Sequence, residues 1–235
     1  MIRRCLMTMY FAALVVGAAL AQEKKTVPPP PKPEDAGPSL EVTMKFIQDK
    51  LNEQGTVYFV LTRSNIDGVL FRQGALMFDV VADASNCTLH VRYKVTNQAE
   101  VTNGTSYIAE DGKRIGGDDL HSESITTTTN PFKDVDSITV ESQQDIYNRM
   151  LAQRGHPELT AVYTPPVFVL ALKGTKKDAF SYHAQYTVGK QAPHQDDFAA
   201  DRNQFDFRDE ETADRVAKAM LHAVELCGGG NKEPF

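Results

Sequence analysis

The apolar positions of this 235-residue chain change period several times along the sequence. A helical period of three to four residues runs through residues 40–51, after the favoured N-cap Ser39 and before the favoured helix stop Gly55. A second helical stripe follows Asp209 or Thr212, either of which is a suitable N-cap. Both segments are therefore expected to be helices with one buried face. The members of the second stripe are Ala213, Val216, Ala217, Met220, Val224 and Cys227.

Between these two segments the apolar residues follow the period of strands. In residues 87–95 the odd positions are mostly apolar and the even positions polar, as in a half-buried antiparallel strand. Ser142 opens a further helix that ends at Gly155, and residues 189–203 are predicted to be a polar loop. Strands are expected at 57–61, 75–82, 87–95, 122–129, 135–140, 167–172 and 179–188, with Phe205 and Phe207 sharing a face of a short additional strand.

The end of the chain carries a resemblance to a known superfold. The run from Phe205 to Glu211, followed by the apolar stripe, looks like the closing strand and helix of the pleckstrin-homology superfold, and also like the endings of uncharacterised exported bacterial proteins. The resemblance covers residues 56–227 and is topological. It implies an α+β domain, an antiparallel β-sandwich or partly open barrel closed by a long C-terminal helix, with an additional N-terminal helix.

Families that use this superfold bind phosphoinositides or peptides. Their basic phosphate-binding cluster is missing from this chain, so the resemblance transfers no ligand.

The first residues resemble an export signal. Arg3 and Arg4 precede an apolar run at residues 6–20, and Ala19-Leu20-Ala21 is the small-x-small pattern that precedes cleavage, here before Gln22. The run is too short to span a bilayer comfortably, and no cysteine follows it to accept a lipid. The expected product is periplasmic or secreted, with no transmembrane segment. The paired arginines leave both the general and the twin-arginine export routes open.

Composition divides the rest of the chain into a linker, one domain and a tail. Residues 22–38 are proline-rich and are predicted to be an extended linker, residues 39–230 form a single α+β domain, and residues 231–235 form a short tail. Without Arg3 and Arg4 the chain has 23 basic and 31 acidic residues, a net charge of −8. This charge repels phosphate backbones, and nucleic acid is rejected as the principal partner.

Processing would leave two cysteines, Cys87 and Cys227. Disulfides persist in exported proteins, and two thiols allow one bridge, which we predict. A nucleophilic cysteine would need a neighbouring base and an electropositive pocket, and neither position suggests one.

Two loop segments offer a histidine with acidic neighbours. His121 follows Asp118 and Asp119, and His194 precedes Asp196 and Asp197. Histidine and carboxylate are common ligands of divalent ions, although these spacings match no established motif. They are the basis of an alternative function, a metal-assisted hydrolase, and otherwise no cofactor is expected.

No sequence motif of a known catalytic site is found in the chain. The leading hypothesis is therefore an exported, non-enzymatic module that binds an unknown protein or envelope component. The metal-assisted hydrolase and a structural envelope protein are the alternatives.

The export signal gives the first testable prediction. Exported protein should begin at Gln22, because Ala19 and Ala21 occupy the two positions at which a signal peptidase requires small residues. Sequencing the N-terminus of exported protein checks this, and a chain that still begins at Met1 would contradict it.

Overall fold

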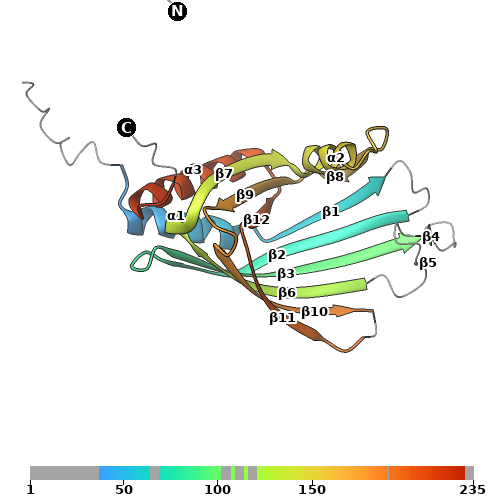
Figure 1. The fold of residues 1–235 in the computed structure, drawn as a ribbon, viewed down its shortest axis with the longest axis horizontal. Helices are drawn as coiled ribbons and strands as arrows, with labels where there is room; N and C mark the ends of the chain where they lie inside the picture. Colours follow the sequence, from blue (N-terminus) through green and yellow to red (C-terminus); the bar gives the residue numbers. More distant parts are fainter. Residues whose placement is uncertain are drawn as a thin grey trace, which may run out of the picture. The chain divides into compact units, whose positions relative to one another are not determined.

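The computed structural model describes residues 37–63, 69–101, 107–108, 114–115, 121–189 and 191–230 (Figure 1). The predicted signal segment, its cleavage site between Ala21 and Gln22, nearly all of the linker and the tail at 231–235 lie outside these ranges. The candidate metal ligands Asp118 and Asp119 also lie outside them.

The described part of the chain contains three α-helices, one 3-10 helix and twelve strands. The helices are α1 (Leu40–Glu53), η3 (Phe132–Asp134), α2 (Gln143–Gln153) and α3 (Glu210–Leu226). The strands are β1 (Thr56–Arg63), β2 (Val69–Asp83), β3 (Thr88–Val101), β4 (Tyr107–Ile108), β5 (Arg114–Ile115), β6 (His121–Pro131), β7 (Val135–Ser142), β8 (Ala161–Thr164), β9 (Phe168–Gly174), β10 (Phe180–Val188), β11 (His194–Ala200) and β12 (Arg202–Phe207).

The strands form a larger and a smaller antiparallel sheet. The larger sheet has the order β11-β10-β6-β3-β2-β1-β8, and the smaller has the order β12-β9-β7. Strands β4 and β5 form a separate pair. Because β11 and β8 stand at opposite ends of the larger sheet, it does not close into a barrel. The predicted α+β class, with antiparallel sheets and a C-terminal helix, is confirmed.

The main core lies where α3 packs on α1 and on the smaller sheet (Figure 1). Met220 of α3 and Leu170 and Leu172 of β9 are fully buried in it, together with Phe207 of β12. The predicted stripe of α3 is buried from Ala213 to Val224, and Cys227 at its end is partly buried. A smaller cluster around Val57, Phe59 and Tyr163 lies on one face of the paired strands β1 and β8, and Tyr147 of α2 packs against it.

A side-chain cap begins each of the three described α-helices. The sequence predicts the capping residue of α1 and of α2, and offers two candidates, Asp209 and Thr212, for α3. The hydroxyls of Ser39 and Ser142 accept backbone N–H bonds from the first turns of α1 and α2. Asp209 accepts the backbone N–H of Thr212 at 2.7 Å, so Asp209 is the N-cap of α3. These bonds satisfy donors that have no partner inside the helix.

Two edge strands differ from the sequence prediction. Strand β11 lies within residues 189–203, which are predicted to be a loop, and the four-residue strand β8 is not predicted at all. The side chains of β11 are exposed or nearly so on both faces, so the strand has no apolar alternation to reveal it. Its pairing with β10, from Phe180 with Ala200 to Tyr186 with His194, holds it in the sheet.

A disulfide joins Cys87 to Cys227, with a sulfur–sulfur distance of 2.05 Å. It ties the turn between β2 and β3 to the end of α3, which are 140 residues apart in sequence. Cys87 is predicted to open the third strand, but it is the last residue of the turn, with a positive φ of 52°. The pairing itself is the one the sequence predicts.

Reducing this disulfide should destabilise the domain. For a closed loop of 140 residues, chain entropy gives an upper limit of about 5 kcal/mol in the free energy of unfolding. The measurement is urea unfolding of oxidised and reduced protein. Mass spectrometry of non-reduced peptides is the control, and free thiols at both positions in exported protein would refute the bridge.

Candidate functional site

The two faces of the larger sheet carry different side chains. We call inner the face with the buried Val57, Val80 and Val91, which packs on the cores, and outer the opposite face, with Tyr58 and Arg92. Successive side chains of a strand point to opposite faces, so the register assigns every residue to one of them. Each face has a concavity that could hold a ligand.

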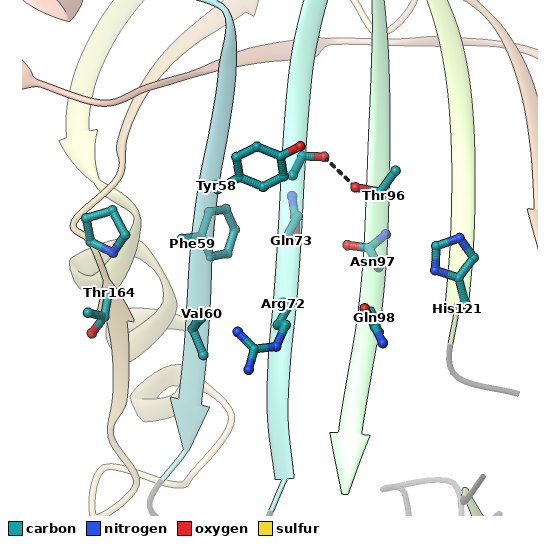
Figure 2. Close-up of a pocket in the computed structure, with 12 residues that line it drawn as sticks. Tyr58, Phe59, Val60, Arg72, Gln73, Thr96, Asn97, Gln98, His121 and Thr164 are labelled. Carbon is teal, nitrogen blue, oxygen red and sulfur yellow. Dashed lines mark hydrogen bonds between the residues drawn. The ribbon is translucent and has the colours of Figure 1, made fainter. Parts of the chain in front are cut away.

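The outer concavity is a hollow of about 390 Å³ that crosses β8, β1, β2, β3 and β6 (Figure 2). On the outer face, its lining combines the ring of Tyr58 with amide, guanidinium and imidazole groups. We call it the Tyr58 hollow. It is lined by Tyr58, Phe59, Val60, Arg72, Gln73, Gly74, Thr96, Asn97, Gln98, His121, Thr164 and Pro165.

The Tyr58 ring rests on the backbone of Gly74. Tyr58, Gly74 and Thr96 stand opposite one another on β1, β2 and β3, and Figure 2 shows the ring reaching from β1 across β2. A β-carbon added to Gly74 would lie 2.6 Å from Cε1 of Tyr58 and 3.0 Å from Oγ1 of Thr96. Glycine therefore makes room for the ring. Tyr58 is still 67% exposed, so much of the ring faces solvent.

Polar side chains form the next row of the Tyr58 hollow. The register pairs Val60 with Arg72, Arg72 with Gln98, and Gln98 with His121, so these residues share the outer face with Tyr58 (Figure 2). None of the described residues that line the hollow is acidic. The hollow thus offers an apolar ring face beside groups that hydrogen-bond hydroxyls or anions.

The inner concavity is a cleft between the inner face of the larger sheet and the smaller sheet. It has two parts, of about 380 and 240 Å³, which share Tyr93 and Gln204. The larger part is lined by Tyr93, Thr139, Glu141, Ile146, Arg149, Val169, Ala171, Tyr182, Arg202, Asn203 and Gln204. The smaller part, which we call the Asp206 cavity, is lined by Gln73, Ala75, Met77, Tyr93, Val95, Ser124, Thr126, Gln204, Phe205 and Asp206.

Asp206 lies on β12 between Phe205 and Phe207, whose side chains point into the main core. Strand alternation turns Asp206 the other way, into the cleft. Burial raises the pKa of its carboxyl from 3.8 to about 6. Burial is also the main reason why the pKa of Tyr93 is raised. A hydrogen bond with Thr126 opposes this rise in the Tyr93 pKa, and the charge of Asp206 adds to it.

Tyr182 lines the larger part of the cleft. Its hydroxyl donates to the backbone carbonyl of Arg202 at 2.5 Å, and its ring stacks on Phe198 with centroids 4.7 Å apart. Burial, with smaller contributions from Tyr93 and Asp201, raises the pKa of the Tyr182 hydroxyl far above its ordinary value. Tyr182 therefore remains a neutral hydrogen-bond donor.

The candidate metal ligands that lie within the described ranges are separated by the sheet. His194 pairs with Tyr186, which pairs with Ser124 of β6. His121 lies three positions from Ser124 on the same strand, so the two histidines point to opposite faces of the sheet. The same alternation separates Asp196 from Asp197. Within the described residues no group of three or more His, Cys, Asp or Glu side chains could hold a metal ion.

A histidine–aspartate pair, His183 with Asp197, is present on the outer face. Nδ1 of His183 lies 2.7 Å from a carboxylate oxygen of Asp197, and both side chains are exposed. The register places His183 on the exposed outer face, opposite Thr127. An exposed pair of this kind contributes little to stability.

Neither Tyr58 nor Asp206 is predicted from the sequence to be a site residue. Tyr58 belongs to an apolar run, and its significance depends on standing opposite Gly74, which only the register reveals. Asp206 carries a weak signal, since it is a single acid between two core phenylalanines. That pattern indicates a strand with one polar side, without indicating that this side is also enclosed.

The raised pKa of Asp206 predicts a pH-dependent stability. Because the pKa is higher in the folded chain than the ordinary 3.8, ionised Asp206 costs at most about 3 kcal/mol of folding free energy. The cost is full above pH 6 and disappears near pH 4. Asp206→Asn should therefore be more stable than the wild type at pH 7.5 and lose that advantage at pH 4.

Urea unfolding at several pH values measures this difference. Asp201→Asn, at an exposed position, is the matched control. A stability difference between wild type and Asp206→Asn that does not change with pH would contradict the prediction.

Within the described ranges, none of the helices has the length and apolar character needed to cross a membrane. A scan against protein-family models finds no match, and searches of curated proteins and of solved structures find none either. The geometry of the two concavities is therefore the basis for assigning a function.

Proposed function

We propose that this chain is an exported, non-enzymatic binding module that holds a saccharide of the cell envelope, a β-1,4-linked pyranose chain, in the Tyr58 hollow. The observation that carries the proposal is the Tyr58 ring, which rests on Gly74 and is 67% exposed. An aromatic ring fixed against a sheet, with its other side open, is suited to stacking on a flat ligand.

A pyranose ring is such a ligand, because its axial C–H groups form an apolar face. The Tyr58 ring already lies against the backbone of Gly74. Because the Tyr58 side chain is already ordered before a ligand binds, the entropic cost of fixing it on binding is small.

The polar row beside the ring suits the edge of the same sugar. Sugar hydroxyls both donate and accept hydrogen bonds, and Arg72, Gln98 and His121 offer amide, guanidinium and imidazole groups. The hollow crosses five strands of an open sheet face. This shape favours an extended chain over a small molecule, which usually binds in an enclosed pocket.

The other parts of the proposal have separate support. The disulfide between Cys87 and Cys227 supports export, because disulfides persist outside the cytoplasm. Antiparallel sheets that end in β12 and α3 support the pleckstrin-homology-like resemblance as a proposal about the fold. The metal-assisted hydrolase has no support of this kind, since His121 and His194 lie on opposite faces.

Removing the ring should weaken saccharide binding. Calorimetric titration of the purified protein with a hexasaccharide of β-1,4-linked N-acetylglucosamine should detect binding. Tyr58→Ala should lower the affinity about tenfold, which corresponds to about 1.4 kcal/mol of lost stacking. Gly74→Ala should weaken binding as well, because the added β-carbon displaces the end of the Tyr58 ring.

Tyr186→Ala is the matched control, because Tyr186 is an exposed tyrosine on the inner face. This variant should bind like the wild type. Unchanged binding by Tyr58→Ala would refute the site. Absence of binding to this hexasaccharide, to cellohexaose and to soluble peptidoglycan glycan strands would refute the saccharide.

A further inference from the structure

The Asp206 cavity is independent of the Tyr58 hollow in its chemistry. It lies between β12 and the inner face of β2, β3 and β6, and has a volume of about 240 Å³. Ala75, Met77 and Val95 on the inner face of the larger sheet provide apolar walls. Asp206 and Tyr93 are the only ionisable residues among the described residues that line it.

Among the described residues, the Asp206 carboxyl has no partner of opposite charge. No ion pair or hydrogen bond to its carboxylate oxygens is found among the described residues, although its backbone carbonyl accepts the side-chain amide of Gln54 at 2.5 Å. Burial disfavours the ionised form, which is why the pKa is raised to about 6. The Asp206 side chain is partly buried, and a carboxylate removed from most of the solvent is normally paired or bound to a cation.

The basic groups that line the adjoining part of the cleft do not pair with Asp206. Arg149 of α2, in the adjoining part of the cleft, is paired with Glu141 of β7 at 2.5 Å. Arg202 lies on the same strand as Asp206 but is exposed. The remaining titratable neighbour, Tyr93, is neutral at ordinary pH because its pKa is raised.

We propose that the Asp206 cavity binds a small primary amine with an apolar body. The ammonium group donates to the Asp206 carboxylate, and the apolar body lies against Met77, Val95 and the ring of Tyr93. Gln73, Ser124, Thr126 and Gln204 add neutral hydrogen-bonding groups around the charge.

The residues of the cavity favour an amine over a divalent metal ion. Calcium and magnesium take six or more oxygen ligands and usually more than one carboxylate. The cavity has one carboxylate and several apolar walls. An ammonium ion needs only hydrogen-bond acceptors, and an aromatic ring beside it adds a favourable cation–π contact.

The test compares butylamine with butan-1-ol, a neutral molecule of the same size, by NMR titration of the full exported chain. At pH 7.5 butylamine should bind, with chemical-shift changes at Tyr93 and Thr126, and butan-1-ol should bind at least tenfold more weakly. At pH 5 a carboxyl whose pKa is about 6 is about one-tenth ionised, so butylamine affinity should fall about tenfold.

Asp206→Asn should bind butylamine no better than butan-1-ol at either pH. Asp201→Asn, which removes an exposed acid, should behave like the wild type, and this excludes a general effect of net charge. Equal affinities for the amine and the alcohol, or wild-type amine binding by Asp206→Asn, would overturn the proposal. Thermal unfolding of both variants confirms that they are folded.

Discussion

The packing of α3 on the smaller sheet determines which surfaces of this domain remain available to bind a ligand. The stripe from Ala213 to Val224 covers the face of β9 and β12 that carries Leu170, Leu172, Phe205 and Phe207. Burial of this much apolar surface is the largest favourable term in the fold. Because α3 occupies one face of the smaller sheet, the residues on its other face, including Asp206, are left to line the cleft. The disulfide fixes the end of the same helix to the turn between β2 and β3.

Strand alternation then separates two kinds of surface on the larger sheet. Val57 and Phe59 point inward into a small apolar cluster, whereas Tyr58 between them points outward. An outward aromatic residue on an open sheet is ordinary in itself. What distinguishes Tyr58 is Gly74 on the neighbouring strand, which lets the ring lie on the backbone. Glycine destabilises a strand interior, so Gly74 lowers the stability of β2 while it makes room for the Tyr58 ring.

Features that depend on the local period of apolar residues are predicted from the sequence. Features that depend on the long-range register between strands are not. The caps at Ser39, Ser142 and Asp209 and the stripe of α3 follow from neighbours three or four residues apart, and all are found. The disulfide follows from cysteine count and compartment. Strand β11 is missed because both its faces are exposed. That His121 and His194 fall on opposite faces of the sheet also follows only from the register. The Tyr58–Gly74 and Asp206–Tyr93 pairs join distant segments, and no local pattern specifies them.

The two concavities differ in what they cost the folded protein. The Tyr58 ring covers the backbone of Gly74, whose carbonyl accepts a hydrogen bond from Thr96, so its placement costs little stability when nothing is bound. Asp206 is different, because an apolar residue facing Met77 and Val95 would be more stable in the same position above pH 6. Such a destabilising carboxyl is characteristic of functional sites, where stability is reduced to provide an interaction for a ligand. The ammonium group of an amine compensates the buried charge directly, and this explains why the cavity combines a single acid with apolar walls.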